Sequence, residues 1–69
     1  MNESLHQRID EAILASPHLQ NRRVTINEDD GRVVLRGRVP SYFQKQMAQE
    51  TVKRVEGVAL VENLIEVTY

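Results

Sequence analysis

Residues 31–41, Gly-Arg-Val-Val-Leu-Arg-Gly-Arg-Val-Pro-Ser, decide how the chain folds. Side chains alternate between the two faces of a β-strand, so Val33, Leu35 and Val39 share one face and the arginines of the stretch share the other. Proline has no N–H to donate to a sheet, so Pro40 ends the pattern. The stretch therefore predicts a strand with one apolar face and one basic face.

The residues before this strand predict its antiparallel partner. Residues 23–27 alternate in the same way, and residues 28–31 form an acidic segment that ends in Asp-Gly. Asp-Gly between two alternating stretches is a typical signal for a tight hairpin turn. We therefore expect a β-hairpin from Arg23 to Val39.

The residues after the strand predict a helix and a third strand. Ser41 and Gln44 have the spacing of a capping box, so a helix is expected to begin at Tyr42. Gly57 suits the left-handed backbone position just past a helix end. Residues 61–68 alternate again and predict the third strand. The buried stripe of the helix is expected at positions three or four residues apart: Gln44, Met47, Ala48, Thr51, Val52 and Val55.

A first helix is predicted before the hairpin, over about residues 3–16. Its apolar stripe runs from Leu5 to Ile13 at helical spacing, and a proline just after the helix stops the pattern. Ser4 is expected to cap this helix, with Asn2 as the alternative cap.

The predicted element order is α-β-β-α-β. The second strand, the second helix and the third strand form a βαβ unit with a right-handed crossover, so the third strand is expected to lie parallel to the second. Each helix has one apolar stripe and the hairpin has one apolar face, so both helices must cover the same face. The expected fold class is α+β: αββαβ, with a three-stranded mixed sheet in the order 1-2-3 and two helices packed on one face. The expected core consists of Leu5, Ile9, Ile13, Val24, Ile26, Val33, Leu35, Val39, Met47, Val52, Val55, Val61, Ile65 and Val67.

Composition limits what the chain can do. It has 69 residues, enough for one small domain over residues 1–69, with no cysteine and a net charge of −1. This charge argues against a nucleic-acid binder held by bulk charge. No apolar run is long enough to cross a membrane, and the residues from Met1 to Ser4 do not open a signal peptide.

The sequence predicts neither a catalytic site nor a metal site. The two histidines, His6 and His18, do not have the spacing of metal ligands. The acidic segment over residues 28–31 is too short for a calcium loop, whose ligands are spread over about twelve residues. We therefore expect no enzyme, no metal and no cofactor.

The polar residues of the sheet have structural explanations. A sheet that binds single-stranded nucleic acid presents aromatic side chains for stacking, and none is predicted on the basic face, so no nucleic-acid partner is expected. Glu62 and Glu66 are expected to face Arg36 and Arg38 across the parallel pair as solvated ion pairs. Asn63, on the inward side of the third strand, is expected to be a buried amide that bonds local backbone.

Three apolar residues lie off the predicted core stripes. Leu14 is on the opposite side of the first helix from Leu5, because the helical period is about 3.6 residues. Tyr42 and Phe43 flank the stripe at the start of the second helix. A contact site, if the chain has one, is expected at these residues.

The chain resembles the BON domain family, which is named for bacterial osmotic-stress and nodulation proteins. The resemblance extends from about Leu5 to Val67 and is centred on residues 31–41. Further residues that carry it are Ala48, Val55-Glu56-Gly57-Val58, Val61, Asn63 and Val67. The resemblance implies an αββαβ fold, no enzymatic activity, and attachment to membranes by contact with phospholipid, often in the bacterial periplasm.

The resemblance also implies a function and partners. It implies a non-catalytic attachment module that binds phospholipid membrane surfaces or a membrane-associated assembly; the alternative is a protein-protein interaction or self-association module without lipid binding. The expected partners are an anionic phospholipid or a membrane-associated protein, with a weak homodimer. Arg22 and Arg23 would join Leu14, Tyr42 and Phe43 as lipid or partner contacts. The expected compartment is the periplasm or a membrane for part of a longer exported chain, and the cytoplasm for a complete chain.

Overall fold

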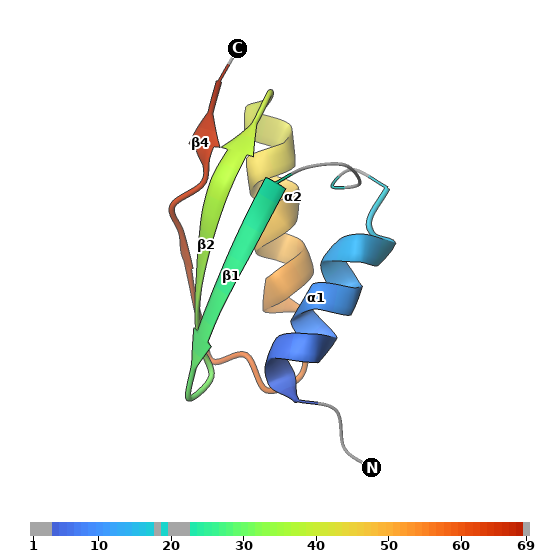
Figure 1. Ribbon diagram of the computed structural model, residues 1–69, viewed down its shortest axis with the longest axis vertical. Helices are drawn as coiled ribbons and strands as arrows, with labels where there is room; N and C mark the ends of the chain where they lie inside the picture. The colour runs from blue at the N-terminus through green and yellow to red at the C-terminus, as the bar shows by residue number, and fades with distance from the viewer. Residues whose placement is uncertain (1–3, 18, 20–22, 69) are drawn as a thin grey trace.

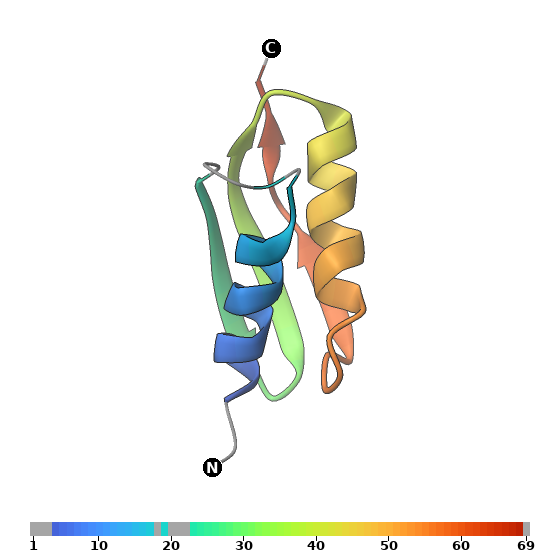
Figure 2. The same cartoon turned by 90° about the vertical axis from the view of Figure 1, so that its right-hand side faces the viewer.

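The computed structural model describes residues 4–17, 19 and 23–68, with Arg23 described by its backbone alone. In this part of the chain, two helices lie on one face of a mixed sheet and leave the other face open (Figures 1 and 2). This is the predicted α+β arrangement, with strand order β1-β2-β3. The elements are α1 (Leu5–Ala15), β1 (Arg23–Asp29), β2 (Arg32–Val39), α2 (Tyr42–Lys53), β3 (Leu60–Asn63) and β4 (Glu66–Val67).

The hairpin forms because its two turn residues adopt the left-handed backbone that a tight turn between antiparallel strands needs. Asp29 pairs with Arg32 at the end of the ladder, and Asp30 and Gly31 between them have φ angles of 55° and 86°. The N–H of Gly31 also donates a hydrogen bond to the Glu28 carboxylate at 3.2 Å. The predicted turn is confirmed.

The third strand lies parallel to β2, as predicted, but it is broken into β3 and β4. The register against β2 is the same on both sides of the break. At the break, the side-chain oxygen of Asn63 accepts a hydrogen bond from the N–H of Ile65 at 3.1 Å. A side-chain bond to the backbone two residues on turns the chain locally and competes with the ladder. The prediction of one continuous strand over residues 61–68 is therefore wrong at residues 64–65.

A cluster of buried apolar side chains fills the space between the helices and the sheet. The predicted core residues are buried or packed against this cluster, except Met47, which is only partly buried and lies outside it. Its neighbour Ala48 takes the fully buried place on α2. Leu19 is buried without having been predicted, because it lies in a connection where no periodicity marks it. The buried residues are Ile9, Ile13, Leu19, Val33, Leu35, Val39, Ala48, Val52 and Ile65.

A serine caps the start of each helix, as the sequence predicts. The Ser4 hydroxyl accepts a hydrogen bond from the backbone N–H of Gln7 at 3.1 Å, so Ser4 is the cap and α1 begins at Leu5; the alternative cap, Asn2, lies outside the described residues. Past the end of α2, Gly57 has φ 103°, the left-handed backbone that was predicted there. A Cβ at Gly57 would come within 3.2 Å of the Leu5 side chain, so this glycine also lets α1 approach closely.

The cap of α2 provides a first test of the fold. The Ser41 hydroxyl accepts a hydrogen bond from the N–H of Gln44 at 3.2 Å and satisfies one of the unpaired donors at the helix start. Replacing Ser41 with Ala removes this acceptor and is expected to lower the free energy of unfolding by about 1 kcal/mol in urea denaturation. Ser41→Asp keeps an acceptor at the same place and should be close to the native protein. Equal stability of the native protein and Ser41→Ala would contradict the role of the cap.

Candidate functional site

Exposed apolar side chains lie at the C-terminal end of α1 and at the N-terminal end of α2. In Figures 1 and 2 the N-terminal end of α2 lies at the top of the molecule, whereas α1 rises from the lower end and its last turn lies at about mid-height. Leu14 is 70% exposed in the last turn of α1, and Tyr42 and Phe43 are 65% and 56% exposed in the first turn of α2. We call these three residues the apolar end. They are exposed because the buried stripes of the two helices, such as Ile13 in α1, point toward the sheet.

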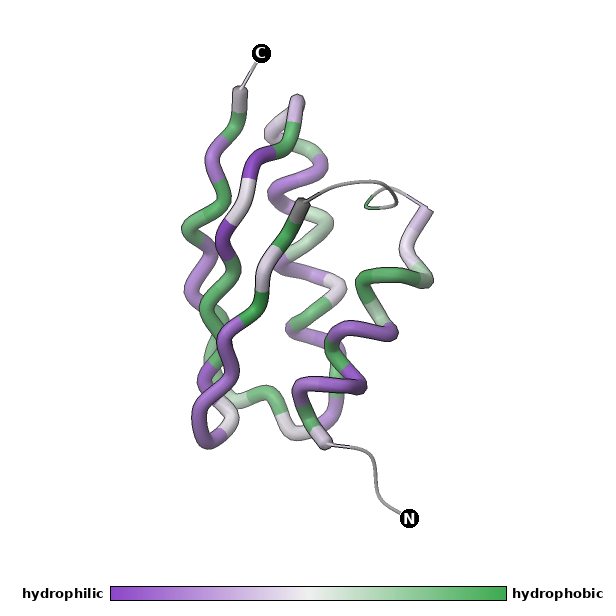
Figure 3. Tube along the Cα trace, in the orientation of Figure 1, coloured by the Kyte–Doolittle hydropathy of each residue, from purple (hydrophilic) through white to green (hydrophobic). Residues whose placement is uncertain are grey.

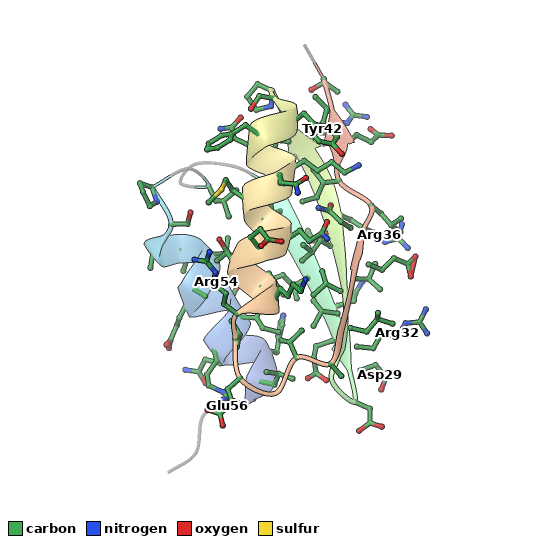
Figure 4. The ribbon with its side chains drawn as sticks, turned by 180° about the vertical axis from the view of Figure 1, so that it is seen from behind. Asp29, Arg32, Arg36, Tyr42, Arg54 and Glu56 are labelled. Carbon is green, nitrogen blue, oxygen red and sulfur yellow. The ribbon has the colours of Figure 1, made fainter. Side chains whose placement is uncertain are left out.

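The opposite end of the molecule is acidic. The hairpin turn, with Glu28, Asp29 and Asp30, lies there and is hydrophilic, whereas the last turn of α1 is hydrophobic (Figure 3). Figure 4 places Asp29 and Glu56 at this lower end and Tyr42 at the upper end. The acidic hairpin turn therefore lies at the opposite end of the 40 Å long axis from the start of α2.

The two arginines that were expected to accompany the apolar residues are only partly placed. Arg22 lies outside the described residues. The backbone of Arg23 begins β1, on the upper end of the sheet (Figure 1). The structure thus places Tyr42 and Phe43 in the first turn of α2 at the upper end, and Leu14 lower, in the last turn of α1.

The open face of the sheet carries a solvated charge network. Arg38 pairs with Glu66 at 3.3 Å, as predicted, but Glu62 pairs with Arg32 at 3.4 Å and not with Arg36. The register explains this, because Glu62 lies opposite Val34 and is therefore diagonal to both neighbouring arginines. Arg32 and Arg36 point away from the helices (Figure 4). All four paired side chains are at least 43% exposed, so these ion pairs add little stability.

Two hollows lie between α2 and the strands β3 and β4. One hollow of about 220 Å³ is lined by residues 58–61 with Gln49 and Lys53. A larger hollow of about 590 Å³ is lined by residues 63–68 with Tyr42 and Lys45. We call the two hollows together the edge groove.

Asn63 joins the two walls of the edge groove. Its amide nitrogen donates to the backbone oxygen of Lys45 at 2.9 Å and to the side-chain oxygen of Gln49 at 3.3 Å. Its amide oxygen accepts the N–H of Ile65 at 3.1 Å. The predicted bond to local backbone is confirmed at Ile65, but Asn63 is only partly buried rather than buried, and its amide also bonds the distant backbone of Lys45 in α2.

Residues 2–69 match the family model of the BON domain. The chain belongs to the BON domain family. BON domains are lipid- or membrane-binding or protein-interaction modules and are generally non-catalytic. A search of curated proteins finds no significant match.

Within this BON domain, the described residues hold no group of three or more histidine, cysteine or acidic side chains that could bind a metal ion. Over residues 4–17, 19 and 23–68, no helix is long and apolar enough to cross a membrane.

The edge groove of the BON domain was not predicted from the sequence. Lys45, Gln49 and Lys53 recur every four residues on α2, beside the predicted buried stripe, and this spacing was the available signal. The sequence does not show that this side of α2 lies along the free edge of a strand, because that placement depends on how the helix packs on the sheet.

Proposed function

We propose that this BON domain is a non-catalytic module that attaches to anionic phospholipid surfaces through its apolar end. The observation that carries the proposal is the distribution of exposed apolar side chains. Of the five large apolar residues that are exposed in the described part of the chain, Leu14, Tyr42 and Phe43 belong to the apolar end, opposite the acidic hairpin turn. Exposed apolar side chains that gather at one place are typical of interaction sites.

The strength of such a contact follows from its small area. Inserted apolar surface contributes about 25 cal/mol per Å², and each basic residue near an anionic membrane adds about 1 kcal/mol. Arg22 and Arg23 follow Leu14 in the sequence, and Arg23 begins β1. They are the basic residues proposed to lie near the membrane. Binding by one domain is therefore weak and sensitive to salt.

The net charge of −1 does not oppose this orientation. Charges in solution are screened over about 8 Å at physiological salt, whereas the molecule is 40 Å long. The acidic turn at the far end is thus too distant to be repelled by the membrane surface. Only the charges within about 8 Å of the membrane surface contribute to the electrostatic attraction.

Vesicle co-sedimentation tests the proposal. The native domain should bind vesicles that contain phosphatidylglycerol and not vesicles of phosphatidylcholine alone, and added salt should release part of the bound protein. Leu14→Ser combined with Phe43→Ser should lower the bound fraction about threefold or more, because it removes apolar area from the apolar end.

Leu60 and Leu64 provide the matched control. They are 57% and 41% exposed on β3 and just after it, and neither belongs to the apolar end, although Leu64 lines the larger hollow together with Tyr42. Replacing both with Ser removes two leucine side chains and should leave vesicle binding unchanged. Equal losses in the two double variants, or no binding to either vesicle, would refute attachment through the apolar end.

A further inference from the structure

The outer edge of β3 and β4 has free backbone groups. The N–H groups of Leu60, Leu64 and Thr68 donate to Gly31, Leu35 and Val39 on the side of β2, at 3.3, 2.8 and 2.9 Å. Backbone groups of successive strand residues point to opposite sides, so residues 61, 63, 65 and 67 present theirs to the outer edge. Within the described residues, β3 and β4 pair with β2 alone. The edge can therefore accept another strand.

One of these outward groups is already in use. The N–H of Ile65 donates to the side chain of Asn63, which also holds the edge against α2. The backbone groups of Val61 lie beside the smaller hollow and those of Val67 beside the larger one. An added strand thus finds free partners on both sides of Asn63.

The wall of the edge groove on α2 is basic. Lys45 lines the larger hollow and Lys53 the smaller one, and they are the two lysines of the chain. Neither forms an ion pair with any residue that the structure describes. Glu66 also lines the larger hollow, but its carboxylate pairs with Arg38 at 3.3 Å. Two uncompensated positive charges therefore face the space beside the free edge.

We propose that the edge groove binds an extended acidic peptide, which adds to the outer edge of β3 and β4 as a further strand and places carboxylates beside Lys45 and Lys53. Addition of a strand at a free edge uses backbone hydrogen bonds for affinity and side-chain pockets for specificity. The charge of the lysines selects an acidic partner. This second surface meets the apolar end at Tyr42, which lines the larger hollow, whereas Leu14 and Phe43 line neither hollow. It extends the proposed attachment to protein partners.

The geometry also predicts the spacing of the acidic residues. Lys45 and Lys53 are eight residues apart on α2, which corresponds to about 12 Å along a helix. A strand rises about 3.3 Å per residue, so two residues four positions apart on the peptide span about 13 Å. They also lie on the same face of the peptide strand. Two carboxylates four positions apart are therefore matched to the two lysines.

The test uses synthetic nine-residue peptides of valine and threonine with two glutamates. One peptide has its glutamates four positions apart, and a second, of identical composition, has them three positions apart and therefore on opposite faces. Titration of isotope-labelled protein, followed by NMR, should show tighter binding of the first peptide. The largest amide shifts should occur at Val61 and Val67. Equal affinity of the two peptides, or largest shifts along β1, would overturn the proposal.

Charge variants show which cations hold the peptide. Lys45→Gln combined with Lys53→Gln should weaken binding about fivefold or more. Arg36→Gln combined with Arg54→Gln removes the same charge from exposed positions outside the edge groove and should leave binding unchanged. Equal weakening by both double variants would contradict the assignment, because it would reflect net charge alone.

Vesicles of phosphatidylglycerol separate this proposal from membrane attachment. The double lysine variant should retain vesicle binding through the apolar end and lose peptide binding. Loss of vesicle binding with intact peptide binding would show that the lysines contact lipid and would overturn the peptide site. The Leu14→Ser, Phe43→Ser variant should lose vesicle binding and keep peptide binding, which would show that the two sites act separately.

Discussion

Replacing Leu35 with Ala is expected to lower the free energy of unfolding by about 2–5 kcal/mol. Leu35 is 0% exposed, and it lies on the central strand β2, between Ile26 of β1 and Asn63 of β3. The substitution removes buried apolar surface and leaves a cavity that neighbours on three strands cannot fill. Native proteins have about 5–15 kcal/mol of stability in total and small domains are the least stable, so the variant should lose a large fraction of its stability. Urea denaturation followed by circular dichroism measures the effect.

Leu64→Ala is the matched control for Leu35→Ala. It makes the same chemical change in the same sheet, but Leu64 is 41% exposed and lies outside the core cluster. Its expected cost is about 1 kcal/mol or less. Similar costs for the two variants would show that β2 does not form the centre of the core.

Replacing Asn63 with Ala is expected to lower the free energy of unfolding by about 1–3 kcal/mol. The Asn63 side chain bonds the backbone oxygen of Lys45 and the backbone N–H of Ile65, and both bonds are lost in the variant. A partly buried donor or acceptor without a partner carries most of its desolvation penalty, so the cost exceeds that of a surface hydrogen bond. Hydrogen exchange should also quicken at the amide of Ile65.

Asn27→Ala controls for the loss of an asparagine in a strand. Asn27 is exposed on β1, and the variant should change stability by about 0.5 kcal/mol or less. If Asn63→Ala costs no more than Asn27→Ala, Asn63 does not hold α2 to the strand edge. The break between β3 and β4 would then need another cause.

The elements that depend on near neighbours were predictable from the sequence. The caps at Ser4 and Ser41 depend on an N–H three residues further on, and the hairpin turn depends on two adjacent residues with left-handed backbone. The alternation of β2 predicted which side chains are buried, because strand geometry assigns successive residues to opposite faces. The order of strands followed from the handedness of the βαβ crossover.

The candidate sites were predicted less completely. The exposure of Leu14, Tyr42 and Phe43 follows from their positions off the helical stripes, and the sequence showed it. The predicted ion pair of Glu62 with Arg36 was wrong. A side chain that lies opposite Val34 can reach the arginine on either side of it, and Glu62 pairs with Arg32. Which arginine it reaches depends on side-chain conformations that alternation does not determine.

By itself, the sequence determined the local structure of this BON domain: where helices begin, where the hairpin turns and which face of β2 is apolar. Only the tertiary structure decided the burial of Leu19, the break after Asn63 and the edge groove beside Lys45. The Asn63 amide meets the backbone of Lys45 across 18 positions of sequence. Contacts of this range form only when α2 packs on the sheet, and the shape of the core, rather than any local pattern, sets that packing.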